Sequence, residues 1–151
     1  MDLDPQASLT MAFGIDVASL DASVYDLFLD DDLPITDIAV QTTIDGVRLV
    51  PSHPDFATAE MALINELERE RMLAARLSAA DLSSFDVLLI DAPPALGLIS
   101  INILVAASEL IIPIEPHPLS LLVLPRLFDT IARVRRLNPG LRVVGFLPTW
   151  R

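Results

Sequence analysis

The sequence predicts an α/β fold, a three-layer, doubly wound arrangement around a mostly parallel sheet, formed as a single domain over residues 1–151. Three observations lead to this prediction. Several segments are nearly continuous runs of Val, Ile and Leu, which is typical of strands buried on both faces. Stretches with helical periodicity alternate with these runs. Hydrophobic residues make up 52% of the 151-residue chain, which is enough for one packed core.

Three segments are expected to be buried parallel strands: residues 85–91, 109–115 and 141–149. Each is rich in Val, Ile and Leu and carries little charge in its interior. Residues 46–52 form a weaker fourth candidate, because a proline interrupts the segment near its end.

Four helical segments connect these strands. Residues 54–82 have apolar positions at helical spacing and are expected to form one long helix or two. Residues 96–108 are apolar almost all round, which predicts a well-buried helix. Residues 119–140 are amphipathic beyond Pro125 and end at Asn-Pro-Gly, while residues 23–32 indicate a short helix that runs into an acidic turn.

The composition excludes several classes of function. A net charge of −11 argues against a general affinity for nucleic acid by this segment alone, and the absence of cysteine excludes disulfides and cysteine-based metal sites. All ten basic residues are arginines, so no mechanism can draw a lysine from this sequence. No secretory leader is evident, and the uncharged run at 92–108 contains prolines and a glycine, so we expect no membrane span. These features are compatible with a cytoplasmic protein.

Acidic residues stand at the ends of two apolar segments. Asp2 and Asp4 flank a leucine at the start, and Asp91 ends the strongest predicted strand. In parallel α/β sheets, ligands bind beyond the carboxyl ends of the strands. A carboxylate at such a place is costly unless it is solvated, paired or bound to a cation. From this pattern alone, a cation site and an ordinary turn or helix-capping carboxylate remain alternatives.

Longer motifs make a family resemblance visible. The segments "DLDPQASLTMAFGI", "VRLVPSHPDFATAE", "FDVLLIDAPPALGLISINILVAASELIIPIEP" and "LFDTIARVRRLNPGLRVVGFLPT" follow one another in this order. The chain thereby resembles the ParA/Soj branch of the deviant-Walker P-loop ATPases, which segregate plasmids and chromosomes. The most specific parts are Asp-Leu-Asp-Pro-Gln and Ile-Asp-Ala-Pro-Pro, the latter followed by Gly97 and Asn102.

The resemblance implies a role for each acidic residue, with Mg²⁺ and ATP as cofactors. Asp91 takes the Walker B role and holds Mg²⁺, mainly through water, against the β- and γ-phosphates. Asp4 matches the acid that positions the attacking water, and Asp2 matches its companion acid nearer the metal. Pro93 and Pro94 would stiffen the turn behind Asp91, where the nucleotide state is sensed.

Departures from the family pattern are equally informative. Family members begin with a strand and a glycine-rich KGGVGKTT loop, whose lysine reaches the phosphates, and they continue beyond the point where this sequence stops. We therefore expect a partial P-loop NTPase fold that lacks its first central strand and is inactive alone. Met1 is interpreted as an internal valine codon read as a start, or as the start of a gene remnant. Because a central strand is missing, we expect the isolated chain to be unstable, aggregation-prone or dependent on another chain.

Three functions follow from the resemblance. In the complete family form, ATP drives dimerisation and binding to non-specific DNA on the nucleoid, and a ParB-like partner stimulates hydrolysis. The alternative is a decayed, non-catalytic interaction module that pairs with a full-length ParA or with a ParB-like protein. The assembly implied by the resemblance is a homodimer, or a heterodimer with a full-length ParA. A MinD-like relative is a third reading, although no C-terminal membrane-targeting helix is visible. Arg133, Arg135 and Arg136 complement a helix dipole or contribute to DNA binding.

Overall fold

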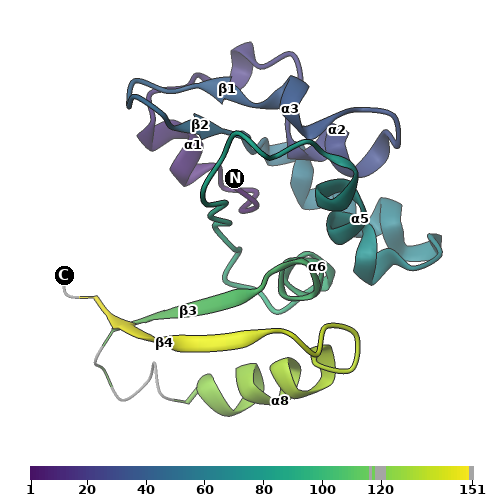
Figure 1. Ribbon diagram of the computed structural model, residues 1–151, viewed down its shortest axis with the longest axis vertical. Helices are drawn as coiled ribbons and strands as arrows, with labels where there is room; N and C mark the ends of the chain where they lie inside the picture. The colour runs from purple at the N-terminus through teal and green to yellow at the C-terminus, as the bar shows by residue number, and fades with distance from the viewer. Residues whose placement is uncertain (116, 118–121, 150–151) are drawn as a thin grey trace.

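Two groups of elements make up the chain in a computed structural model, which describes residues 1–115, 117 and 122–149. The first group holds short helices and a β-hairpin from the N-terminal part, and the second holds a parallel strand pair with its helices (Figure 1). The segment that follows α5 connects the two groups and leads into helix α6 (Figure 1). No helix among the described residues has both the length and the apolar character needed to cross a membrane.

The N-terminal group begins with helix α1 (Ser8–Ala12) and the 3₁₀ turn η1 (Val17–Ser19), followed by α2 (Val24–Leu29) and α3 (Ile35–Ile38). Helix α2 confirms the predicted short helix within 23–32. It begins with a capping box, because the Ser23 hydroxyl accepts from the Tyr25 amide at 3.2 Å and the Asp26 carboxylate accepts from the Ser23 amide at 2.8 Å.

Residues 54–82 are more broken than expected. They form η2 (Pro54–Thr58), α4 (Ala59–Ala62), η3 (Leu63–Asn65), η4 (Arg69–Arg71) and α5 (Met72–Ala79). The prediction of one long helix or two is therefore wrong. Glu68 has a left-handed backbone with φ of 53°, which no α-helix can include, so the chain turns between η3 and η4.

Helix α6 (Leu98–Ala106) joins two hydrophobic clusters, and its predicted burial is confirmed. Ile99 and Ile103 pack into the first cluster with Phe28 and Phe56, whose ring centroids lie 5.3 Å apart. On its other side the helix contributes to a second cluster, which consists of Leu104, Val105, Ile131, Val134 and Leu141. Helix α6 thus contributes to the apolar packing of both groups of elements.

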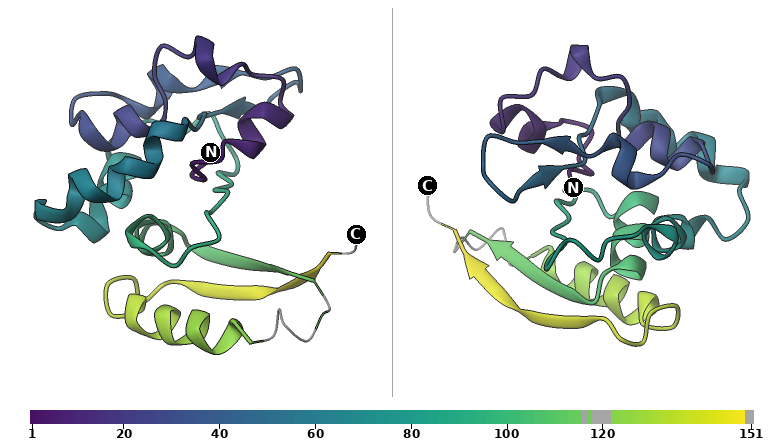
Figure 2. Two further views of the ribbon diagram at one scale, coloured as in Figure 1. Left: turned by 180° about the vertical axis from the view of Figure 1, so that it is seen from behind. Right: turned by 45° about the horizontal axis from the view of Figure 1, so that its top comes forward.

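Strands β3 (Glu109–Ile114) and β4 (Arg142–Pro148) form a parallel pair, as the sequence predicts. Helix α8 (Leu124–Val134) connects them and runs beside β4 in both views of Figure 2. It confirms the amphipathic helix expected within 119–140, although residues 118–121 lie outside the described part. Burial on both strand faces is a wrong prediction, because Ile111 is 54% exposed and Val144 and Phe146 are also exposed.

The expected strand over 85–91 is the main correction. Only its last residue pairs, in an isolated parallel bridge between Asp91 and Asp2. Val87 and Leu89 are 70% and 73% exposed. Within the described residues, the backbone hydrogen bonds between this segment and residues 1–3 involve only Leu89 and Asp91, which is too few for a ladder.

Residues 46–52 also form less strand than expected. They contribute β2 (Arg48–Leu49), which pairs antiparallel with β1 (Val40–Gln41). Each strand of this hairpin has only two residues, and neither belongs to a parallel sheet. The α/β class and the parallel pairing of β3 with β4 are nevertheless as predicted.

Candidate functional site

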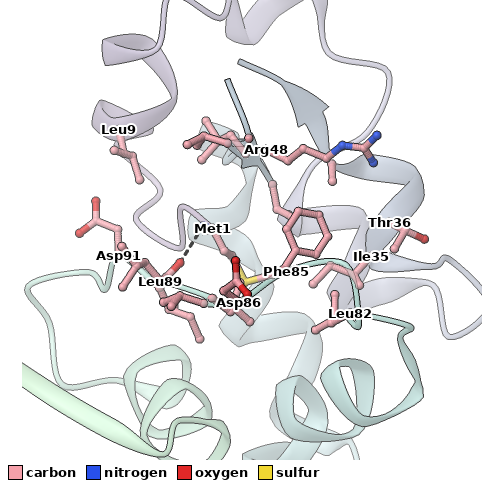
Figure 3. A pocket seen from close by; sticks show the side chains of 18 of the residues that line it. Met1, Leu9, Ile35, Thr36, Arg48, Leu82, Phe85, Asp86, Leu89 and Asp91 are labelled. Atoms are coloured by element: carbon pink, nitrogen blue, oxygen red, sulfur yellow. Dashed lines mark hydrogen bonds between the residues drawn. The ribbon is translucent and has the colours of Figure 1, made fainter. Parts of the chain in front are cut away.

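Residues 1–3 lie between two other backbone segments and bring the predicted acids together. The Asp2 amide donates to the Val50 carbonyl at 3.0 Å on one side. On the other side the Leu3 amide donates to the Asp91 carbonyl at 3.0 Å, and the Met1 amino group donates to the Leu89 carbonyl at 2.8 Å (Figure 3). Asp2 and Asp91, 89 positions apart in the sequence, therefore adjoin at the end of this pairing.

Asp2 is fully buried, and hydrogen-bond donors surround its carboxylate. Oδ2 accepts from the Thr10 amide at 2.9 Å and from the Thr10 hydroxyl at 2.7 Å, and Oδ1 accepts from the Asp4 amide at 3.1 Å. The Thr10 hydroxyl also accepts from the Ser52 amide at 3.0 Å. Such bonds satisfy a buried charge, so Asp2 fixes the loop that follows it.

Asp4 lies on this loop and is half-buried. Its Oδ1 accepts from the Gln6 amide at 3.0 Å, and its carbonyl accepts from the Ala7 amide at 2.9 Å. Ala7 takes a left-handed backbone with φ of 51° before α1 begins. The tight turn thus holds Asp4 close to the end of the pairing between residues 1–3 and 89–91.

Asp91 has an exposed carboxylate whose pKa is raised above the ordinary carboxyl value. Partial burial is the largest cause, followed by the negative charges of Asp2 and Asp4, while the Met1 ammonium acts in the opposite direction. The structure therefore brings Asp2, Asp4 and Asp91 within electrostatic range of one another. Burial also lowers the pKa of the Met1 amino group, although Asp2 and Asp91 oppose that effect.

This arrangement fits a hydrated magnesium ion. Mg²⁺ keeps several waters and binds proteins through one or two carboxylates together with substrate phosphates. Among the residues that the structure describes, no group of three His, Cys, Asp or Glu side chains could form an all-protein metal cage. An exposed Asp91 carboxylate, beside further negative charge that a cation would neutralise, has the donor chemistry for such an ion.

Pro93 and Pro94 follow Asp91 in the segment that leads to α6, with Pro93 half-buried and Pro94 exposed. Each proline ring fixes its own backbone φ, which limits the conformations open to this segment. Asp91 also lines an apolar pocket of about 640 Å³, together with Leu9, Phe85 and Leu89 (Figure 3). Its few polar side chains make it a poor match to a phosphate site.

The sequence analysis missed Thr10, which orients Asp2, and Ser52, whose amide completes that network. Thr10 carries no sequence signal, because its spacing from Asp2 follows from the turn at residues 4–7. The analysis also missed Glu60, which contacts the start of α6. An acid directly before the apolar run Met61–Ile64 looks like an ordinary exposed helix residue.

Comparisons with known proteins identify the family to which the chain belongs. Residues 1–143 match the family model described as "AAA domain". Sporulation initiation inhibitor protein Soj of Bacillus subtilis is 35% identical over 150 residues, covering 99% of this chain and 58% of Soj. Chromosome partitioning protein ParA of Myxococcus xanthus is 36% identical over 152 residues, covering 99% and 52%. The chain thus spans about half the length of the curated relatives it matches.

A solved structure is also similar to this chain. It is described as cobyrinic acid a,c-diamide synthase from Mycobacterium smegmatis with a bound ATP analogue and magnesium, and it superposes with a TM-score of 0.90 at 36% identity. The match covers 97% of this chain and 59% of that one. The family match over 143 residues, the similarity to Soj and ParA and the shared fold lead to one conclusion: the chain belongs to the AAA-domain family, and within it to the ParA/Soj type of P-loop ATPases.

Proposed function

We propose that this chain carries the magnesium-binding half of the ATP site of a partition ATPase. One observation supports the proposal above all others. Asp4 and Asp91 come from distant parts of the sequence, yet their charges interact at the end of one backbone pairing. The Mycobacterium smegmatis relative was solved with an ATP analogue and magnesium, which supports Mg²⁺ and ATP as the ligands.

Each acid has a distinct part in this proposal. Asp91 holds hydrated Mg²⁺ through its exposed carboxylate, and Mg²⁺ supplies charge neutralisation at the phosphates. Asp4 orients the attacking water from its half-buried position on the turn. Asp2 acts toward the metal indirectly, because its oxygens accept from Thr10 and from the Asp4 amide. Pro93 and Pro94 restrict the segment behind Asp91.

These 151 residues contain no lysine, so they supply no lysine for the β- and γ-phosphates. In this proposal the phosphate-binding loop comes from other residues than these. Binding of ATP by the chain alone is accordingly weak and rests on magnesium contacts, and hydrolysis by the chain alone is not expected.

Titration of Mg·ATP into the purified chain tests the proposal. Wild type and Asp86→Ala should show saturable, magnesium-dependent binding that Asp91→Ala removes. Asp86 is a suitable control, because it lies on the same segment and its side chain makes no hydrogen bond or ion pair among the described residues. If the wild-type chain shows no saturable binding, the nucleotide-site role is overturned for these residues.

A second candidate function is a non-catalytic interaction module. The exposed apolar run at Val87, Leu88 and Leu89 favours it, as does the open face that includes Ile111 and Phe146. Such surfaces suit pairing with a second copy or with a full-length ParA-type chain. Co-purification with Bacillus subtilis Soj, lost on Val87→Lys and kept on Leu67→Lys, would support this function, and equal recovery of both variants would contradict it.

DNA binding, dimerisation and a ParB-like partner belong to the same proposal, together with a cytoplasmic, nucleoid-associated location. Arg133, Arg135 and Arg136 are exposed near the end of α8, where they could neutralise phosphates. Among them, the Arg135 side chain donates to the Leu141 carbonyl at 3.2 Å. Salt-dependent retention of the chain on DNA would support DNA binding if it falls when Arg133 and Arg136 are replaced by alanine. Unchanged retention of this variant would contradict a role for these arginines.

A further inference from the structure

A carboxylate from another helix contacts the segment that follows Asp91. Glu60 lies on α4, and its Oε1 accepts a hydrogen bond from the Ile99 amide at 3.1 Å. Ile99 is in the first turn of α6, where backbone amides lack partners within the helix. Among the described residues, no side chain outside α6 other than Glu60 makes a hydrogen bond with residues 92–99.

Gly97 makes this contact possible. A Cβ atom built at position 97 would lie 2.3 Å from Glu60 Oε1, far inside normal contact distance. Any larger residue would therefore push the carboxylate away from the start of α6. The positive end of the helix dipole favours the negative charge of Glu60 at this place. Within the segment itself, the Ser100 hydroxyl donates to the Ala95 carbonyl, which closes the turn before the helix.

Asp91 stands at one end of this segment and the Glu60 contact at the other. The two prolines limit the backbone between them, so fixing residues 97–99 also restricts where the Asp91 carboxylate can point. We propose that Glu60 is a positioning residue for Asp91, which anchors the segment through the Ile99 amide. This inference rests on the proposed metal-binding role of Asp91 and adds the residue that orients it.

Four variants separate the contributions. Glu60→Ala removes the acceptor, whereas Glu60→Gln keeps an oxygen acceptor and loses only the charge. Gly97→Ala keeps Glu60 and forces its carboxylate away from the helix. Glu66→Ala is the matched control, because Glu66 is an exposed acid in the same region with no side-chain hydrogen bond or ion pair among the described residues.

Two measurements are made on each variant of the full chain: amide hydrogen exchange of residues 92–99, and affinity for Mn²⁺ by electron paramagnetic resonance. Glu60→Ala and Gly97→Ala should speed exchange in residues 92–99 and weaken Mn²⁺ binding by about tenfold, the low end for loss of a residue that orients a metal ligand. Glu60→Gln and Glu66→Ala should stay close to wild type. If Glu60→Ala raises exchange throughout the chain, Gly97→Ala replaces it in the comparison.

Unchanged amide exchange of residues 92–99 in Gly97→Ala and Glu60→Ala would overturn the claim that Glu60 restrains this segment. Faster exchange with unchanged Mn²⁺ affinity would show a purely structural contact and overturn the positioning role. Failure of the underlying function is distinguishable, because the wild-type chain itself would then bind no Mn²⁺ in an Asp91-dependent way.

Discussion

The amide of Asp91 donates a 2.9 Å hydrogen bond to the carbonyl of Met1, so the acid that follows residues 85–90 is held by the first residue of the chain. The contact brings Asp91 close to Asp2 and Asp4, which lie at the start of the sequence, so the three acids form one site. Because the contact is made by backbone atoms, it is insensitive to the side chains on either residue. The charges that gather there are accordingly a consequence of the fold.

Thr10 is expected to be essential for the stability of this arrangement. Thr10→Val removes the hydroxyl that donates to the buried Asp2 carboxylate and accepts from the Ser52 amide. Leaving such groups unpaired should lower the free energy of unfolding by about 1–3 kcal/mol. Urea unfolding at low protein concentration measures the change. Thr58→Val, at an exposed threonine, should change it by much less, and an equal loss in both variants would contradict the prediction.

Asp91 should give the chain a distinctive pH dependence. Its pKa is raised in the folded chain, so the folded state binds the proton more tightly than the unfolded state. The resulting destabilisation is absent well below the ordinary carboxyl value of 3.8 and grows as the pH rises through that value to above the raised pKa. Asp91→Asn should remove this contribution, so the variant gains stability relative to wild type across that window.

Denaturation midpoints of wild type and Asp91→Asn, measured from about pH 3 to about pH 7, test whether the variant gains stability relative to wild type as the pH rises. Asp86→Asn serves as the control on the same segment. A relative gain that is equally large for Asp86→Asn would show that net charge, and not the cluster around Asp91, is responsible.

The exposed apolar run should make the isolated chain self-associate. Val87 and Leu89 lie on a segment with backbone partners on one side only, which is a ready surface for pairing with another chain. Val87→Lys together with Leu89→Lys should shift sedimentation toward the monomer. Leu67→Lys changes a 91% exposed leucine in a turn and should have little effect. A wild-type chain that is monodisperse, monomeric and melts cooperatively would refute the expectation.

Asn102 should contribute strongly to the packing of α6. Its Nδ2 donates to the carbonyls of Arg69 at 2.7 Å and Leu98 at 3.1 Å, and its Oδ1 accepts from the Leu73 amide at 3.1 Å. Asn102→Ala leaves the buried groups of η4 and α5 unpaired, at a cost of about 2–3 kcal/mol. Chemical denaturation should show this loss, and Asn65→Ala, at an exposed asparagine, should not.

Much of the fold could be predicted from the sequence, because several helices and strands are determined by the residue pattern within the element itself. The apolar character of α6, the run at 109–115 and the amphipathic pattern after Pro125 each depend on residues within one element. The expected strand at 85–91 failed for a tertiary reason, because its pattern calls for partners on both sides and the described residues supply one. Likewise Glu68, with its left-handed backbone, carries no local signal for the break before η4.

The acids of the candidate site could be predicted, but their different surroundings could not. Asp2 and Asp4 are separated by one residue, yet one is buried against Thr10 and the other stays half-exposed on a turn. That distinction depends on Thr10 and Ser52, which reach Asp2 through the fold of the intervening chain.

The backbone of Ala7 is unfavourable for any residue with a side chain, by about 1–2 kcal/mol relative to the right-handed form. Local preference therefore opposes the turn that presents Asp4, and burial of Ala7 with the Asp2 network imposes it. A synthetic peptide copied from the first dozen residues would relax into other shapes. The position of Asp4 therefore depends on contacts with the rest of the molecule and is lost when the turn is removed from it.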